Sequence, residues 1–210
     1  MIDTWEELIK PNHNLLDIGC WTGKRINNFK DKCNVYGIDI NTERFKEAPK
    51  EIRGRLKYGD VTKNIPFSYS FDWIILTEVL EHIEQEDAAL KNISNSLKEG
   101  GRLVLSTPKH IPFLNFWDPA WLRWKFGGSE RHKHFKREEL FTQLRKHNLI
   151  VEDYKIEGSL NWLFIRWFNV FLRYVLRVNK QVNSKIGPGY FDWVVIAKKK
   201  GKSVTTNKSL

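Results

Sequence analysis

Short apolar runs alternate with longer polar stretches along this chain. Residues 14–18 place three apolar side chains around one acid, and further apolar runs follow over 34–40, 56–61, 71–77 and 102–108. The run over 71–77 is almost continuously apolar, as expected for a central parallel strand that is buried on both faces. Apolar residues at helical spacing lie between several of these runs. The pattern predicts an α/β fold in which strands alternate with helices.

Two segments are predicted as helices between these strands. Residues 24–32 predict a short helix, and residues 87–98 predict a longer one with its apolar side chains toward the sheet. The glycine pair at positions 100 and 101 follows this second segment and predicts a glycine C-cap. Residues 150–156 and 190–197 predict a sixth and a seventh strand.

A glycine-containing turn follows the first predicted strand. Asp17 is followed by Gly19 and Gly23, and glycine lets the backbone turn sharply beneath a ligand before a helix begins. The spacing lacks the third glycine of the dinucleotide-binding fingerprint, and no P-loop lysine pattern is present. The turn predicts a nucleotide-binding site, with an ordinary strand-turn-helix as the alternative.

Acidic residues also close the second and third predicted strands. Asp39 at the carboxyl end of the second strand is placed to accept hydrogen bonds from both hydroxyls of an adenosine ribose. Its alternative role is to cap the helix that follows. Asp60 follows the third strand, where Gly59-Asp60 by itself indicates a turn.

In order and in motif, these elements resemble the class I S-adenosylmethionine-dependent methyltransferases. Asp17 to Gly23 resembles the family's motif I, Asp-x-Gly-x-Gly-x-Gly, with Trp21 at the central glycine, where an indole would crowd the loop or stack over part of the ligand. Residues 78–82 resemble the Glu-x-Leu-Glu-His signature of the small-molecule branch, which includes quinone-biosynthesis O-methyltransferases. The resemblance covers about 12–157 and 189–199 and implies a Rossmann-like seven-stranded sheet, mostly parallel with an antiparallel last strand.

The resemblance implies transfer of a methyl group from S-adenosylmethionine to an acceptor oxygen, nitrogen or carbon. The sulfonium carbon is already electrophilic, so the protein mainly aligns the attacking atom and removes its proton where necessary. Thr77, Glu78 and His134 would face the acceptor. The residues implied for the cofactor are Asp17, Gly19, Cys20, Gly23, Asp39, Ile40, Asp60, Val61 and Thr77.

Histidines and glutamates supply the candidates for catalysis and metal binding. His134 stands where the family's histidine usually does, and His132 lies two residues away. Both are candidate bases because imidazole titrates near neutral pH. The alternative is that both are structural and anchor the preceding loop. Glu78, Glu81 and His82 share one face if they form a helical turn. In the similar quinone O-methyltransferases these positions are associated with a divalent metal. We favour a corner without metal in which Glu81 and His82 pair.

An aromatic segment over 111–126 holds three tryptophans and three phenylalanines. It follows a strand at the carboxyl edge of the sheet, where open α/β folds bind ligands. We expect it to form a lid over an apolar or aromatic acceptor. A loop that only packs against the protein is the alternative, since tryptophan often serves as bulk.

An insertion over 158–188 separates the last two predicted strands. From 160 to 178, polar residues at 166, 169, 173 and 177 form a helical stripe on an otherwise apolar helix. A transmembrane span is disfavoured, because each of three arginines would cost about 2.5 kcal/mol near the bilayer centre. An anionic membrane surface contacted through 160–180 is one expectation; a cover for the acceptor site and a dimer interface are the others.

Composition narrows these expectations. The 210 residues suffice for one methyltransferase domain over 1–200, with a flexible basic tail over 201–210. Two cysteines without metal-ligand spacing and a polar, acidic start without signal-peptide character predict a cytoplasmic protein. The net charge of +10 is local: residues 1–154 hold 24 basic against 23 acidic side chains, whereas 155–210 hold 11 against 2. This distribution argues against nucleic acid as the partner and allows contact with the inner face of a membrane.

Three functions fit the sequence. The first is a methyltransferase for a small, apolar or lipid-linked acceptor at the membrane periphery. The second is an RNA or protein methyltransferase attracted through the basic C-terminal quarter, although no Asn-Pro-Pro-Tyr-like motif follows the fourth strand. The third is a non-catalytic, nucleoside-binding relative, suggested by Trp21 in the glycine turn. The methyl acceptor, the metal requirement and the oligomeric state stay open.

Overall fold

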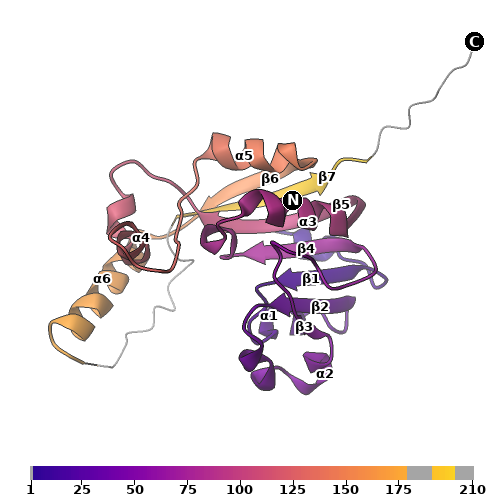
Figure 1. The fold of residues 1–210 in the computed structure, drawn as a ribbon, viewed down its shortest axis with the longest axis horizontal. Helices are drawn as coiled ribbons and strands as arrows, with labels where there is room; N and C mark the ends of the chain where they lie inside the picture. Colours follow the sequence, from indigo (N-terminus) through magenta and orange to yellow (C-terminus); the bar gives the residue numbers. More distant parts are fainter. Residues whose placement is uncertain (1, 179–190, 202–210) are drawn as a thin grey trace, which may run out of the picture.

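A seven-stranded sheet crosses the molecule in the order β3-β2-β1-β4-β5-β7-β6 (Figure 1). The computed structural model describes residues 2–178 and 191–201. The strands from β3 to β5 are parallel, whereas β7 runs antiparallel to both β5 and β6. The predicted sheet is thereby confirmed. Its strands are β1 (Asn14–Ile18), β2 (Asn34–Asp39), β3 (Leu56–Tyr58), β4 (Phe71–Thr77), β5 (Leu97–Pro108), β6 (Leu149–Glu157) and β7 (Asp192–Lys199).

Both faces of the sheet are buried, because successive residues of a strand point to opposite sides. On β4, Ile74 and Leu76 join a core that includes side chains from α3 (Glu86–Ser96) and α5 (Arg137–Lys146). Trp73 and Ile75 join a second core with side chains from α1 (Lys24–Asn27) and α2 (Lys50–Arg53). This double burial explains the continuous apolar run over 71–77.

Several boundaries differ from the sequence prediction. The helix expected over 24–32 is only the single turn α1, and the residues after it form turns. The expected glycine C-cap is wrong, because α3 ends at Ser96 and Leu97 already pairs with Phe71 of β4. Gly100 and Gly101 lie inside β5, where the register shifts against β4. A Cβ at Gly101 would lie 3.0 Å from the Phe71 carbonyl oxygen, so glycine permits this close approach of the strands.

The remaining elements lie mainly at the ends of strands. Short 3₁₀ helices are η1 (Trp5–Leu8), η2 (Thr42–Glu47), η3 (Leu80–His82) and η4 (Asn115–Trp117), and α4 (Pro119–Lys125) follows η4 directly. The aromatic segment is therefore largely helical rather than an open loop. Asp118 caps α4, since its Oδ1 accepts a hydrogen bond from the Ala120 amide at 3.0 Å, and Pro119 takes the first helical position.

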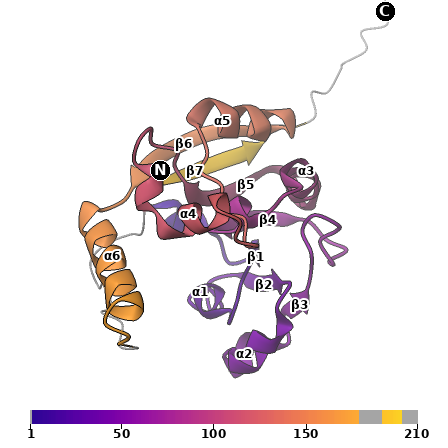
Figure 2. The ribbon, with the colours of Figure 1, turned by 60° about the vertical axis from the view of Figure 1, so that its left-hand side comes forward.

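The insertion forms helix α6 (Leu160–Tyr174), which projects from one end of the molecule near α4 (Figure 2). The helix ends four residues before the expected limit at 178. Trp167 of α6 donates a hydrogen bond from Nε1 to the Trp117 carbonyl oxygen of η4 at 2.6 Å. The part of the insertion from 179 onward and the basic tail from 202 onward lie outside the described residues. Within 2–178 and 191–201, none of the helices is long and apolar enough to cross a membrane.

Candidate functional site

The carboxyl ends of β1, β2 and β3 surround a cavity of about 340 Å³, which we call the strand-end cavity. Its walls include Gly19, Asp39, Ile40, Asp60 and Val61, all of them residues that the sequence analysis assigned to the cofactor. The segment after β4 closes the opposite side with Val79 and residues 82–85. The volume lies within the range of small-molecule sites, and the place is the one where parallel sheets bind ligands.

Gly19 is required by the shape of the turn after β1. Its φ of 74° lies in the left-handed region, and a Cβ there would lie 2.4 Å from a methyl carbon of Val79. Any side chain at this position would therefore push into the wall of the strand-end cavity. The close contact with Val79 is therefore the reason why this turn requires glycine.

Asp39 ties the glycine turn to the end of β2. Its Oδ2 accepts a hydrogen bond from the Trp21 amide at 2.8 Å, and its Oδ1 accepts one from the Asn41 amide at 2.8 Å. The N-cap of η2 is Asn41, whose side chain accepts from the Glu43 amide, so the alternative cap role does not belong to Asp39. Each carboxylate oxygen can accept a second bond, which leaves Asp39 able to bind ligand hydroxyls.

Asp17, Cys20 and Gly23 support the turn from behind and are absent from the cavity walls. Asp17 is buried, its Oδ1 has no hydrogen-bond partner, and the Arg25 guanidinium lies 3.9 Å away. Burial raises the pKa of Asp17 to about 7, although Arg25 opposes this shift. Burial also raises the pKa of the Cys20 thiol, which packs in the core beside Gly37.

The structure shows the surroundings of Asp60 and Trp21, which their sequence motifs alone did not determine. The Asp60 carboxylate accepts hydrogen bonds from the amide and hydroxyl of Thr62 at 3.0 and 2.6 Å, and the hydroxyl bond lowers its pKa. Trp21 is half exposed with a left-handed φ of 51°, and the Arg44 guanidinium lies 4.5 Å from its ring centre. Since Trp21 is not among the lining residues, its indole leaves the strand-end cavity open.

A second cavity, of about 510 Å³, lies between α4 and α6; we call it the interhelical cavity. His82, Arg131 and His132 form part of its wall together with residues of the two helices. His82 belongs to the walls of both cavities, so the two adjoin at this side chain. The residues contributed by the helices are Pro119, Ala120, Leu122, Arg123, Trp167, Asn169, Val170, Arg173 and Tyr174.

The two candidate bases share one buried carboxylate. Nε2 of His132 and Nε2 of His134 each lie 3.0 Å from Oδ2 of Asp118. Burial would raise the pKa of Asp118, but the hydrogen bonds from both histidines lower it overall. Burial lowers the pKa of His134, whose side chain has no exposed surface. The pair therefore anchors the start of α4, and only His132 also reaches the interhelical cavity.

Thr77 and Glu78 lie away from both of the cavities that His82 lines. Glu78 leaves β4 with a left-handed φ of 55°, and its carboxylate accepts a hydrogen bond from the Ser106 hydroxyl at 2.6 Å. The helical turn η3 begins only at Leu80, so the expected common face of Glu78, Glu81 and His82 is wrong. Thr77 and Glu78 instead line a hollow of about 290 Å³ near the N-terminal segment.

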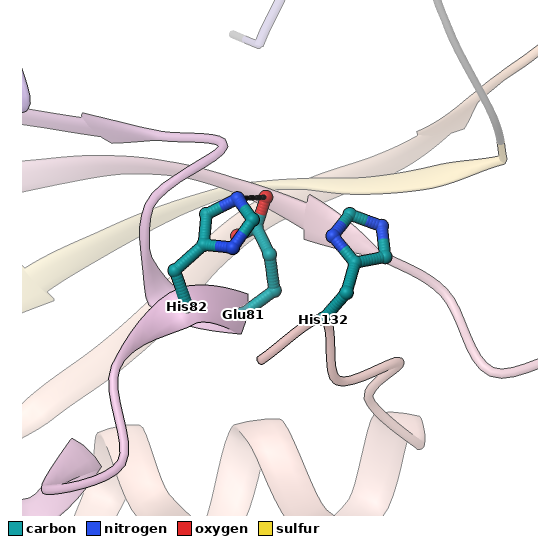
Figure 3. A group of neighbouring side chains, drawn as sticks. All are labelled: Glu81, His82 and His132. Carbon is teal, nitrogen blue, oxygen red and sulfur yellow. Dashed lines mark ion pairs between the residues drawn. The ribbon is translucent and has the colours of Figure 1, made fainter. Parts of the chain in front are cut away.

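Glu81, His82 and His132 come together instead (Figure 3). Glu81 is fully buried, and its Oε2 accepts a hydrogen bond from the Thr107 hydroxyl at 3.3 Å. His82 Nε2 lies 3.7 Å from Glu81 Oε1, which is the pairing that the sequence analysis expected for this corner. The approach of His132 was missed because it comes from a segment about fifty residues later. Asp118 was missed as well, although Asp-Pro is a recognisable start of a helix.

Residues 2–153 match the methyltransferase domain family. The O-methyltransferase rstn1 of Aspergillus nomiae is 30% identical over 101 residues, which cover 44% of this chain and 45% of that protein. The ubiquinone/menaquinone biosynthesis C-methyltransferase UbiE of Shewanella woodyi is 28% identical over 123 residues, or 52% and 49% of the two chains. The chain thus spans less than half the length of these curated relatives.

The fold has close counterparts among solved structures. A SAM-dependent methyltransferase from Methanosarcina mazei superimposes with a TM-score of 0.67 over 94% of this chain and 97% of that one. At 18% sequence identity, this likeness concerns the arrangement of strands and helices.

Proposed function

This chain belongs to the methyltransferase domain family, and from that premise we propose that it transfers a methyl group from S-adenosylmethionine to a small, apolar or lipid-linked acceptor. The observation that carries the proposal is the adjacency of the two cavities at His82. One cavity is lined by several of the residues expected for the cofactor, and the other has walls of mixed apolar and charged side chains, which suit an amphipathic acceptor. A methyl donor and an acceptor held in them would meet at their common wall.

The strand-end cavity fits the cofactor by its donors and its shape. Asp39 would accept hydrogen bonds from the ribose hydroxyls, and Asp60 with Val61 would face the adenine. Asp17 lies behind the turn with the Arg25 guanidinium 3.9 Å from its Oδ1, so it would act on the cofactor through the turn and not by lining the cavity. Gly19 allows close approach of the backbone. When bound, S-adenosylmethionine supplies an electrophilic methyl carbon, and the protein has to align an attacking atom with it.

The interhelical cavity fits an amphipathic acceptor. Trp167, Val170 and Leu122 offer apolar and aromatic surface, while Arg123 and Arg131 offer cationic groups. Residues of both the aromatic segment and the insertion line this cavity, which supports the proposal that the two segments cover the acceptor. Of the two candidate bases, His132 is the better placed to act on an acceptor, because His134 does not line this cavity.

The outer face of α6 supports delivery of the acceptor from a membrane surface. Phe164, Phe168 and Phe171 follow one another at steps of four and three, and they are 72%, 50% and 46% exposed. Arg173 and Arg177 add positive charge near the end of this apolar stripe. The helix would lie in the interface of an anionic bilayer, with its inner face toward the interhelical cavity.

Calorimetric titration with S-adenosylmethionine and S-adenosylhomocysteine tests the cofactor part. We expect the wild type to bind both, and Asp39→Ala to bind at least tenfold more weakly because charge-assisted hydrogen bonds are lost. Asp31→Ala is the matched control, since Asp31 is exposed and pairs only with the neighbouring Lys30. Thermal unfolding of each variant separates loss of binding from loss of fold.

Methyl transfer is then followed with labelled S-adenosylmethionine on water-soluble and lipid extracts. Label that enters the lipid fraction supports the proposed acceptor class. Label that enters only RNA or protein would contradict the acceptor, and a folded wild type that binds neither cofactor form would contradict the activity.

A further inference from the structure

We propose that Glu81, His82 and His132 bind a divalent metal ion, with Zn²⁺ as the best match, in the wall of the interhelical cavity. The metal site itself stands on the geometry of these side chains. Its role in catalysis rests on the proposed methyl transfer.

The three side chains supply ligand atoms at nearly the right separation. One nitrogen of each histidine and one carboxylate oxygen all lie within 4.8 Å of one another, and Glu81 Oε1 is 3.7 Å from His82 Nε2. In a tetrahedral zinc site the ligand atoms lie roughly 3.3 Å apart, because each is about 2 Å from the ion. Figure 3 shows the rings of His82 and His132 on either side of the glutamate. Side-chain rotations of small amplitude would complete the coordination.

A hydrogen bond made by one nitrogen of each histidine ring determines that the other nitrogen carries the lone pair. His82 Nδ1 lies 2.6 Å from the Arg131 carbonyl oxygen, which can only accept, so this nitrogen carries the proton and Nε2 is left with a lone pair. His132 Nε2 lies 3.0 Å from the Asp118 carboxylate, so by the same argument its Nδ1 is the acceptor. Metal-binding histidines are oriented by such bonds to carbonyl or carboxylate oxygens.

The atoms that face one another are therefore three acceptors. Within the part of the chain that the structure describes, His132 Nδ1 and Glu81 Oε1 are both buried without a hydrogen-bond partner. Glu81 itself is fully buried, while Thr107 satisfies its other oxygen. A buried carboxylate without a donor is unfavourable unless it is paired or coordinates a metal. A cation placed between these atoms would satisfy all three at once.

Two other groupings of nearby residues fit a metal less well. Asp118, His132 and His134 also lie close together, but there the carboxylate already accepts hydrogen bonds from both rings and needs no further cation. The set expected from the sequence contained Glu78, whose carboxylate instead accepts the Ser106 hydroxyl. The structure thus replaces Glu78 with His132.

Two histidines and one carboxylate leave an open coordination position, as in catalytic rather than structural zinc sites. Because His82 and His132 line the interhelical cavity, an acceptor hydroxyl could take that position. With His132 bound to the metal through Nδ1, the metal would take over the activation of the acceptor that the metal-free protein would leave to this imidazole. Zinc lowers the pKa of a bound water to about 7, and a hydroxyl would release its proton to solvent in the same way. The oxygen lone pair would then form the C–O bond as the sulfonium C–S bond breaks, with that electron pair going to sulfur. The site thus favours oxygen as the attacking atom.

Calorimetric titration of chelator-treated full-length protein with ZnCl₂, followed by absorption spectroscopy with CoCl₂, tests the site. We expect one ion per chain and a loss of affinity of at least tenfold in His132→Gln and in Glu81→Gln. Glu78→Gln should bind zinc like the wild type. Since Glu81 is fully buried, thermal unfolding is measured for each variant, and His132→Gln decides the outcome if Glu81→Gln does not fold.

Four results would overturn the site. They are a folded wild type that binds no zinc, unchanged affinity in His132→Gln, equal loss in Glu78→Gln, and loss in His134→Gln with none in His82→Gln. Titration with S-adenosylmethionine distinguishes failure of the metal site from failure of the proposed methyltransferase function. Binding of S-adenosylmethionine without zinc binding would remove the metal alone, whereas zinc binding without cofactor binding would remove the methyltransferase activity.

Discussion

At the scale of single residues, burial converts a motif acid into a group that titrates near neutral pH. Asp17 lies behind the glycine turn without access to solvent, and its pKa rises to about 7. In the unfolded chain it would titrate near 3.9. Between these values the folded protein holds a proton that the unfolded chain has released, so this residue makes stability fall as pH rises from about 4 to 7.

Asp17→Asn should therefore stabilise the cofactor-free protein at pH 8 and leave it unchanged at pH 4. The gain at pH 8 is at most roughly 4 kcal/mol, since one pKa unit corresponds to about 1.4 kcal/mol. Urea unfolding of both proteins at the two pH values measures it. Asp31→Asn, at an exposed position, should show no such difference. Equal stability of the Asp17 variant and the wild type at pH 8 would contradict the assigned titration.

Sequence alone predicted some of these residues well and others not at all. Asp39 and Gly19 were expected at a strand end and a turn, and the structure has them there in the wall of the strand-end cavity, because such local features are defined by neighbouring residues. The meeting of Glu81 with His132 could not be predicted, because it depends on how a distant segment returns over η3. Which nitrogen of His132 carries the lone pair depends in addition on Asp118, which lies in a different segment of the chain.

At the scale of elements, Asp118 holds α4 in place by three bonds. Its carboxylate accepts from the Ala120 amide and from the rings of His132 and His134. Asp118→Ala would remove the N-cap, which is worth about 1 kcal/mol, and would leave two buried rings without their acceptor. We expect a loss of stability of roughly 2–5 kcal/mol in denaturant unfolding.

Asp118→Asn supplies the comparison for this variant. Its side-chain oxygen can keep the bond from the Ala120 amide, but an NH₂ group then replaces Oδ2, which accepts from both rings. The cap is kept while the charge and the ring acceptor are lost, so the loss of stability should be smaller than in the alanine variant. If alanine and asparagine destabilised the protein equally, the bonds to the two rings rather than the cap would hold the helix. If neither destabilised it, α4 would depend on its aromatic packing alone.

Element boundaries were harder to predict than the elements themselves. The glycine pair after α3 matches the pattern of a helix C-cap. In the structure it lies in β5, where the lack of a side chain lets this strand come close to β4. The aromatic segment was expected as a loop, because its density of large side chains hid the capping signal of Asp118-Pro119. In the first case a contact between strands determined the local structure, and periodicity along the chain does not contain that contact; in the second the signal was local but was not recognised.

At the scale of the whole molecule, the apolar stripe of α6 predicts binding to anionic membranes. We expect the protein to co-sediment with vesicles that contain an anionic lipid, and less so at high salt, since electrostatic attraction is screened. The triple variant Phe164→Ser, Phe168→Ser and Phe171→Ser should bind at least tenfold more weakly, because it loses apolar surface that would enter the bilayer.

The matched control is Ile150→Ser, which removes an exposed apolar side chain from β6. It should bind vesicles like the wild type. Equal binding by the triple variant would contradict the membrane contact. If the wild type instead formed a dimer in sedimentation that the triple variant did not, the stripe would be covered by a second copy of the chain.

His82 has a further consequence through its position between the two cavities. A ligand that shifts its ring from the strand-end side also reshapes the interhelical side, and the reverse holds equally. Two binding equilibria that share a movable group are thermodynamically linked, and each ligand must change the affinity of the other by the same factor. If binding in either cavity moves the His82 ring, the affinities of the proposed donor and acceptor are coupled through this side chain, and neither affinity is a constant of its own site.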